Sequence, residues 1–141
     1  MLSSDIASAP LANEILEQKS ITETPTYKKF KHRYDKAIEN VHGQLNDFVK
    51  KNAPIDIDKM VDQTLHIVDA SASPLGIFAM LSTLKDYDDS TFNHSLNVAL
   101  IANIFGHWLD LSESDISLLT ACGLLHDIGK LMIPEKIIKK P

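Results

Sequence analysis

The sequence predicts an all-α fold, in which about five main helices form a bundle behind an N-terminal arm. Apolar residues recur at intervals of three and four along most of the chain, a spacing that places them on one face of a helix. The alternation of apolar and polar residues that marks a half-buried strand does not persist anywhere. Apolar residues make up 44% of the 141 residues, which is enough for one small domain with its own core.

The N-terminal arm is expected over residues 1–26, which are rich in Ser, Thr, Ala and Glu and contain two prolines. This composition favours a flexible segment, with at most one short helix over residues 11–16. A helical lead-in is expected over residues 27–86. Residues 87–141 then form a further helical unit.

The first long helix is predicted over residues 27–51, where the apolar side chains form a single stripe. The stripe consists of Phe30, Tyr34, Ile38, Val41, Leu45 and Phe48. Gly43 weakens a helix at this point but need not break it. Two interpretations stay open: the stripe packs against the rest of the same domain, or it forms a seam with a second copy and makes a homodimer through residues 27–51.

Capping residues predict where the next two helices begin. After a break at Pro54, Asp56 or Asp58 caps a helix that ends near residue 70. Ser73 and Pro74 then combine an N-cap with a proline in the first helical turn.

The last two long helices are strongly apolar. The first covers residues 91–109 and is apolar nearly all round, so we expect it in the centre of the domain, with Trp108 in the core. Ser112 caps the second, which Gly129 is expected to end. Cys122 lies inside this helix and is expected to be a small core residue.

Composition excludes several classes of partner. The formal net charge of −5 does not favour general electrostatic binding to a nucleic-acid polymer. The single cysteine cannot form an internal disulfide, which fits a reducing compartment. No signal segment and no apolar run of membrane-spanning length is present in the sequence. We therefore expect a cytoplasmic protein without a membrane partner.

Polar residues interrupt the two most apolar helices. His94 opens the first of these helices, with Asn97 three residues later, and His126 and Asp127 follow one another at the end of the second. A buried carboxylate needs a partner, which can be a cation, a hydrogen-bond network or a metal. A histidine in the core beside an aspartate that caps a helix would produce the same doublet.

A metal site suits these residue types. Imidazole nitrogen and carboxylate oxygen together favour Mn, Fe, Co or Zn, and a carboxylate can bridge two metals. Lys130 follows His126 by four residues, a spacing that places two side chains on one helical face. Its ammonium could hold a phosphate.

Other titratable residues carry less information. The remaining histidines have no comparable partners in the sequence and are expected to be structural or solvated. They are His32, His42, His66 and His107. The acidic turn before residue 91 is expected to be solvated, the alternative being a supporting place near His94. It contains Asp86, Asp88 and Asp89.

Several short motifs follow one another in a specific order. They are His94-Ser95-Leu96-Asn97-Val98, Leu124-Leu125-His126-Asp127-Ile128-Gly129-Lys130, Ile133-Pro134 and Lys140-Pro141. Together they resemble the HD-GYP family, a branch of the HD superfamily of metal-dependent phosphohydrolases. The resemblance covers roughly residues 27–141. It implies a helical bundle of the HD-domain type, with residues 87–141 as the N-terminal half of the HD-GYP domain.

The resemblance also implies roles for individual residues. It makes His94, His126 and Asp127 metal ligands, and Asp127 and Lys130 the catalytic residues, with Lys130 on the substrate phosphate. It implies hydrolysis of cyclic di-GMP with Mn or Fe, while Zn, Co, Ni and Mg are alternatives. Ser90 stands where members with three metals have a glutamate, so we expect two divalent ions.

The family's later ligands and its Gly-Tyr-Pro signature have no counterpart up to Pro141. Three ligands leave a site for two metals incomplete, so we expect that these 141 residues alone do not hydrolyse cyclic di-GMP. Two alternatives stay open. One is a non-catalytic helical module for signalling or dimerisation, and the other is an HD phosphohydrolase that acts on another nucleotide.

Overall fold

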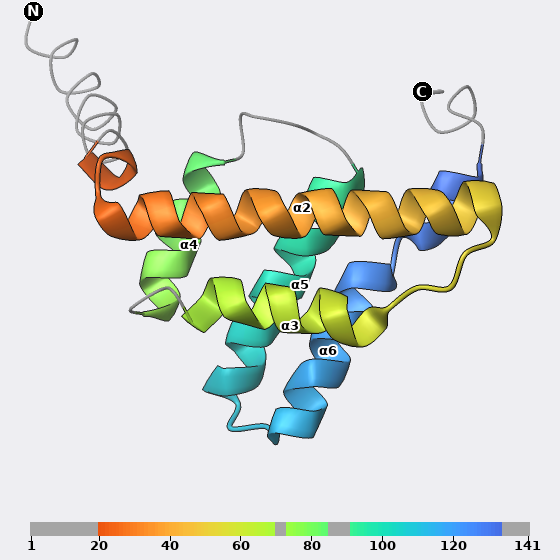
Figure 1. Ribbon diagram of the computed structural model, residues 1–141. Coiled ribbons are helices and arrows are strands. Elements are labelled where there is room, and N and C mark those ends of the chain that lie inside the picture. Colours follow the sequence, from red (N-terminus) through yellow and green to blue (C-terminus); the bar gives the residue numbers. More distant parts are fainter. Residues whose placement is uncertain (1–19, 70–72, 85–90, 134–141) are drawn as a thin grey trace, which may run out of the picture.

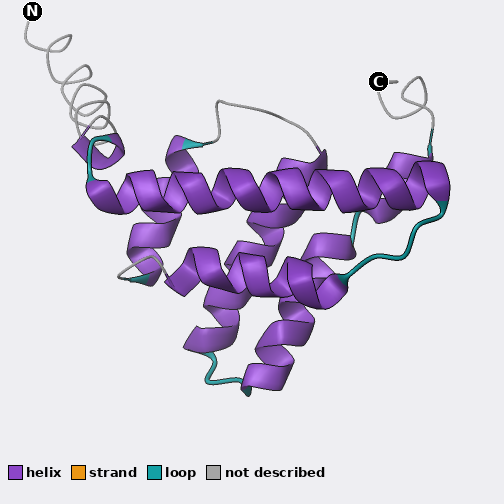
Figure 2. Cartoon of the chain, viewed as in Figure 1, coloured by secondary structure: helices purple, strands orange, loops and turns teal. Residues whose placement is uncertain are grey.

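The computed structural model describes residues 20–69, 73–84 and 91–133, and most of these residues are helical (Figures 1 and 2). No strand occurs within these ranges, which confirms the predicted all-α fold. The elements are α2 (Pro25–Lys51), α3 (Ile57–Asp69), α4 (Pro74–Thr83), α5 (Thr91–Trp108), α6 (Glu113–Leu125) and the short 3-10 helix η1 (Ile128–Met132). No helix in these ranges is long and apolar enough to cross a membrane.

The helices form two layers. In Figure 1, α2 and α3 lie in front, and α5 and α6 form an antiparallel hairpin that crosses behind them. The prediction placed the whole of α5 in the centre of the domain, and the structure buries its middle, where the buried residues lie between Ser95 and Gly106. Its fully buried side chains include Leu96, Ala99 and Leu100, each at 0% exposure.

Helix α2 begins two residues earlier than predicted. Thr24 is its N-cap and accepts a hydrogen bond from the backbone N–H of Tyr27, while Pro25 occupies the first turn. The helix continues through Gly43 and ends at Asn52, whose φ of 52° is a left-handed cap.

The apolar stripe of α2 packs inside the chain. Phe30, Tyr34, Val41 and Leu45 are all buried, and Ile38 packs against the same core. This observation confirms the first of the two interpretations of the stripe. A seam between two copies would have to use other residues of this helix.

The predicted caps of α3, α4 and α6 are confirmed. The side chains of Asp56, Ser73 and Ser112 each accept a backbone N–H three residues further on. The predicted end of α6 is wrong, because the helix stops at Leu125 and Gly129 lies inside η1. The ring of His126, the residue after α6, hydrogen-bonds to the backbone carbonyl of Gly123. This hydrogen bond competes with continuation of the helix.

Two predictions of core positions are also wrong. Trp108 is 52% exposed at the tip of the hairpin, where its ring contacts those of Phe78 and Phe105, and Cys122 is exposed on α6. In α5 and α6 the apolar residues are spread around the helix, whereas in α2 and α3 they lie on one face. The apolar pattern therefore cannot indicate which residues face the core.

Several predictions concern residues outside the described ranges. They are the short helix over residues 11–16, the acidic turn with Asp86, Asp88 and Asp89, Ser90, and the motif residues from 134 to 141.

Candidate metal centre

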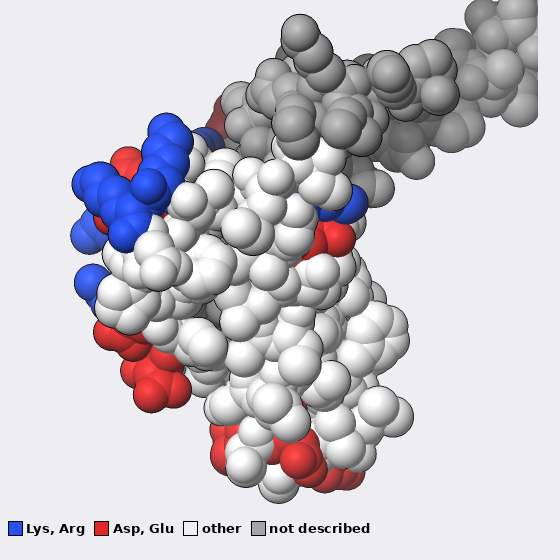
Figure 3. All heavy atoms as spheres, turned by 90° about the vertical axis from the view of Figure 1, so that its right-hand side faces the viewer, with Lys and Arg blue, Asp and Glu red and all other residues white. Residues whose placement is uncertain are grey.

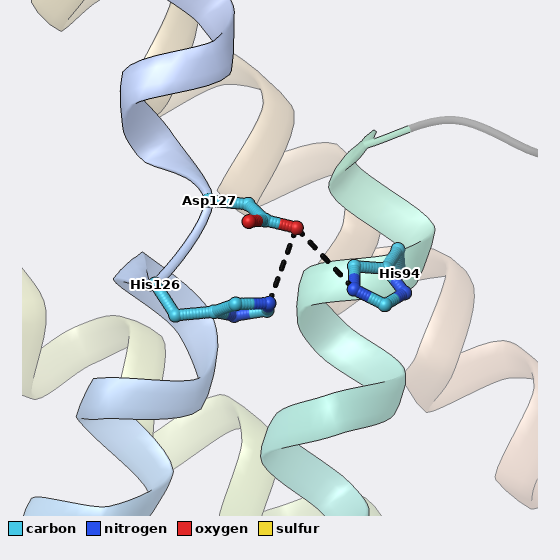
Figure 4. Close-up of side chains that lie close together, drawn as sticks. All are labelled: His94, His126 and Asp127. Carbon is cyan, nitrogen blue, oxygen red and sulfur yellow. Dashed lines mark ion pairs between the residues drawn. The ribbon is translucent and has the colours of Figure 1, made fainter.

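The three predicted ligands lie together: the imidazoles of His94 and His126 both point to one carboxylate oxygen of Asp127 (Figure 4). The Oδ2 atom of Asp127 lies 3.1 Å from Nε2 of His126 and 3.3 Å from Nε2 of His94. The two imidazole ring centroids are 5.2 Å apart. One ligand atom from each residue lies within 4.8 Å of the others, which is a group that could hold a metal ion.

The hairpin of α5 and α6 produces this convergence. His94 lies in the first turn of α5, and His126 and Asp127 directly follow the last turn of α6. Because the two helices are antiparallel neighbours, the start of the first lies beside the end of the second. The side chains extend toward one another from these two ends (Figure 4).

A hydrogen bond orients the ring of His126. Its Nδ1 atom lies 2.7 Å from the backbone oxygen of Gly123, and a carbonyl oxygen can only accept a hydrogen bond. Nδ1 therefore carries a proton. In the neutral ring, Nε2 then carries a lone pair that faces the carboxylate of Asp127 at 3.1 Å.

This arrangement of donors fits a cation. Two electron-rich atoms at such a distance need a proton or another cation to keep them together. A ligand histidine whose other nitrogen donates to a backbone carbonyl is also the usual arrangement around protein-bound metals. The donor set of two imidazoles and one carboxylate therefore suits a divalent ion of the Mn, Fe or Zn type.

Lys130 also reaches the carboxylate. Its Nζ lies 3.1 Å from Oδ2 of Asp127, three residues away along the chain. The prediction that Lys130 shares a helical face with His126 is wrong, because α6 has already ended and η1 carries the lysine. The lysine instead pairs with the aspartate next to that histidine.

The hydrogen bond from Lys130 is the largest influence on the pKa of Asp127 and lowers it below its ordinary value. The charges of His126, Lys130 and His94 act in the same direction, while partial burial opposes them. The carboxyl group is therefore ionised at neutral pH, as a metal ligand must be.

The group is accessible from solvent. The side chains of His94, His126 and Lys130 are 56%, 36% and 51% exposed, and only Asp127 is largely covered, at 15%. Helix α5, which carries His94, contains no Lys, Arg, Asp or Glu, and α6 contains only Glu113 and Asp115 in its first turn. In Figure 3, Lys and Arg gather at the upper left, Asp and Glu lie along the left flank and at the lower end, and most of the remaining face is white.

Sequence reasoning missed one contact that supports the site. The hydroxyl of Tyr34 donates to Oδ1 of Asn97 at 2.7 Å, which ties α2 to the first turns of α5. Asn97 lies one turn after His94, and its polarity in an apolar helix was the available signal. Among the described residues, the remaining histidines do not belong to this metal-ligand group.

Comparisons with known proteins agree with this site. Residues 91–141 match the HD domain family. A cyclic di-GMP phosphodiesterase of Pseudomonas aeruginosa is 36% identical over 61 residues, which are 43% of this chain and 15% of that protein. Ribonuclease Y of Mycoplasma genitalium is 33% identical over 93 residues, which are 66% of this chain and 18% of that protein.

The chain thus spans less than a fifth of either relative. No solved structure gives a significant match. All three converging side chains lie inside the matched family segment. The chain therefore contains an HD domain at residues 91–141.

Proposed function

We propose that this chain is part of a metal-dependent phosphohydrolase of the HD-GYP type, with cyclic di-GMP as its substrate. The observation that carries the proposal is the convergence of His94, His126 and Asp127 inside the HD domain. The likeness to a cyclic di-GMP phosphodiesterase supports the choice of substrate. A cyclic dinucleotide presents the phosphodiester that such a site would attack.

The three ligands would hold divalent ions, for which we propose two ions of Mn or Fe. When bound, such ions supply Lewis-acid activation of water and neutralise charge on a phosphoryl group. Asp127 would contribute its carboxylate to these ions, and the Gly123 carbonyl keeps Nε2 of His126 directed at the site. Lys130 is half-exposed beside the carboxylate, where its ammonium can donate a hydrogen bond to a phosphate oxygen.

Two six-coordinate ions need more donors than the three that converge among the described residues. Waters or further residues must supply the others. We therefore propose that the 141 residues bind metal weakly and do not hydrolyse cyclic di-GMP by themselves.

One observation favours a second substrate class. The likeness to a ribonuclease extends over 66% of the chain, a longer stretch than the likeness to the phosphodiesterase. Both names describe cleavage of phosphodiester bonds, so the same metal chemistry would serve an RNA substrate. The rival proposal of a non-catalytic dimerisation module loses its main feature, because the stripe of α2 is buried within the chain.

The test has a binding part and a hydrolysis part. Mn²⁺ binding to the 141 residues is measured by titration calorimetry for the wild type, Asp127→Asn, His94→Ala and His107→Ala. The last is the matched control, because His107 is an exposed histidine of the same helix outside the metal-ligand group. We expect binding in the wild type and the control, and its loss in the other two with the helical circular dichroism signal retained.

Hydrolysis is tested on the protein in its full natural length, with cyclic di-GMP and with an RNA oligonucleotide. Turnover of cyclic di-GMP that Asp127→Asn abolishes is the expected result. Cleavage of RNA alone would replace the proposed substrate. Equal Mn²⁺ binding by all four forms would contradict the metal site itself.

A further inference from the structure

Gly123 of α6 packs against the backbone of Ala99 in α5 with no room for a side chain. A Cβ atom at this position would lie 2.7 Å from Cα, 2.8 Å from the backbone N and 3.2 Å from Cβ of Ala99. Two of these three atoms belong to the backbone, so no side-chain rotation can relieve the contact. The absence of a side chain at residue 123 is therefore what permits this spacing between the helices.

Gly123 also lies next to the converging ligands. It precedes His126 by three residues, and Ala99 follows His94 by five on the facing helix. In addition, its backbone oxygen accepts the hydrogen bond from Nδ1 of His126. One residue therefore sets both the separation of the helices and the orientation of a ligand ring.

We infer that Gly123 is a positioning residue, whose missing side chain brings the end of α6 close enough to α5 for His126 and Asp127 to meet His94. This role builds on the proposed metal site, but the geometry can be measured without metal. The contact distances predict that Gly123→Ala separates the two helices at the ligand end.

Helix α5 is the less movable partner. Ala99 and Leu100 are fully buried, and the hydrogen bond from Tyr34 to Asn97 ties the start of α5 to α2. A new Cβ at residue 123 would clash with this held backbone, so it is expected to push the end of α6 away from α5 and to separate His126 and Asp127 from His94.

Gly106→Ala provides a matched control. Gly106 also packs against the neighbouring helix, where a Cβ would lie 2.9 Å from Cγ1 of Ile116. This contact involves a side chain and lies toward the other end of the hairpin, near the turn. Both substitutions replace a helical glycine by alanine in a crowded place, but only Gly123 meets backbone atoms and lies near the ligands.

The first measurement is the nuclear Overhauser effect between the ring protons of His94 and His126 in the metal-free 141-residue chain. We expect the signal in the wild type and in Gly106→Ala, and its loss in Gly123→Ala. A folded Gly123→Ala protein that retains the signal would overturn the inference. If this variant does not fold, Ala99→Ser enlarges the facing residue instead, and an unchanged signal in that variant would equally overturn it.

The second measurement is the affinity for Mn²⁺. We expect a loss of about tenfold to a hundredfold in Gly123→Ala, the usual effect of disturbing a ligand's support, and less than about twofold in Gly106→Ala. If both variants lose the same Mn²⁺ affinity, in proportion to the fall in their melting temperatures, the role of Gly123 is merely structural and the inference is overturned. A wild type that binds no Mn²⁺ would instead refute the proposed function, while the ring-proton signal would still decide the role of Gly123.

Discussion

Lys130→Met is predicted to raise the affinity of the chain for Mn²⁺. In the structure, Nζ of Lys130 and both Nε2 atoms approach the same oxygen, Oδ2 of Asp127. A divalent ion that binds this oxygen must displace the ammonium and then remain close to its positive charge. Lys130 is therefore a competitor of the metal, whatever it later does for a substrate.

The size of the effect follows from the exposure of the pair. The lysine side chain is 51% exposed, so water screens its interaction with the carboxylate. Ion pairs of this exposure typically change an equilibrium constant by no more than about fivefold. Repulsion between the ammonium and the bound ion acts in the same direction. We expect Lys130→Met to bind Mn²⁺ roughly threefold to tenfold more tightly than the wild type.

Titration calorimetry at constant ionic strength measures this change. Lys130→Arg keeps the charge and should bind Mn²⁺ about as the wild type does. Lys28→Met removes an exposed lysine at the opposite end of α2 from η1 and should also leave the affinity unchanged (Figure 1). The gain should shrink in high salt because the interaction is screened. Unchanged or weaker binding by Lys130→Met would refute the idea that the lysine and the metal compete.

Two further predictions concern stability. Because the pKa of Asp127 is lowered in the folded chain, its ionised form stabilises folding at neutral pH, and this contribution disappears as pH falls through that lowered pKa. Urea unfolding should therefore show the metal-free wild type more stable than Asp127→Asn near neutral pH and equal to it in strong acid, and a gap that does not vary with pH would contradict this. In the core, Leu100→Ala should lower the free energy of unfolding by about 2–5 kcal/mol, since Leu100 is 0% exposed. Leu118→Ala, on a side chain that is 64% exposed, should change it by less than about 0.5 kcal/mol, and similar losses in both would refute the assigned burial.

Local sequence signals predicted the helix starts well. A side-chain cap acts over three residues, so Asp56, Ser73 and Ser112 carry the information that places their helices. The stripe of α2 was equally informative, because one face of that helix is apolar and the opposite face is polar. This contrast between the two faces indicated which side chains would be buried.

Predictions failed where the apolar pattern of a helix does not indicate which of its faces is buried. Nothing in the apolar patterns of α5 and α6 distinguishes Trp108 or Cys122 from the buried residues around them. Likewise, α6 ends where the ring of His126 hydrogen-bonds to the backbone carbonyl of Gly123, and no helix-breaking residue lies at that end. The early end of α6 also moved Lys130 from the predicted neighbourhood of His126 to a contact with Asp127.

Two conditions make the ligands converge. Their positions along the helix axes can be predicted from the sequence spacing, but the rotation of the helices about those axes cannot. His94 lies 14 residues before the end of α5 at Trp108, and His126 lies 13 residues after the start of α6 at Glu113. At a rise of about 1.5 Å per residue, both are roughly 20 Å from the turn between the helices. Any antiparallel hairpin of these two helices therefore brings them to the same height. Their rotation about the helix axes is a separate matter, since it depends on which faces pack. In this hairpin the faces that carry Gly123 and Ala99 pack against each other, and this packing makes neighbours of two residues at equal height.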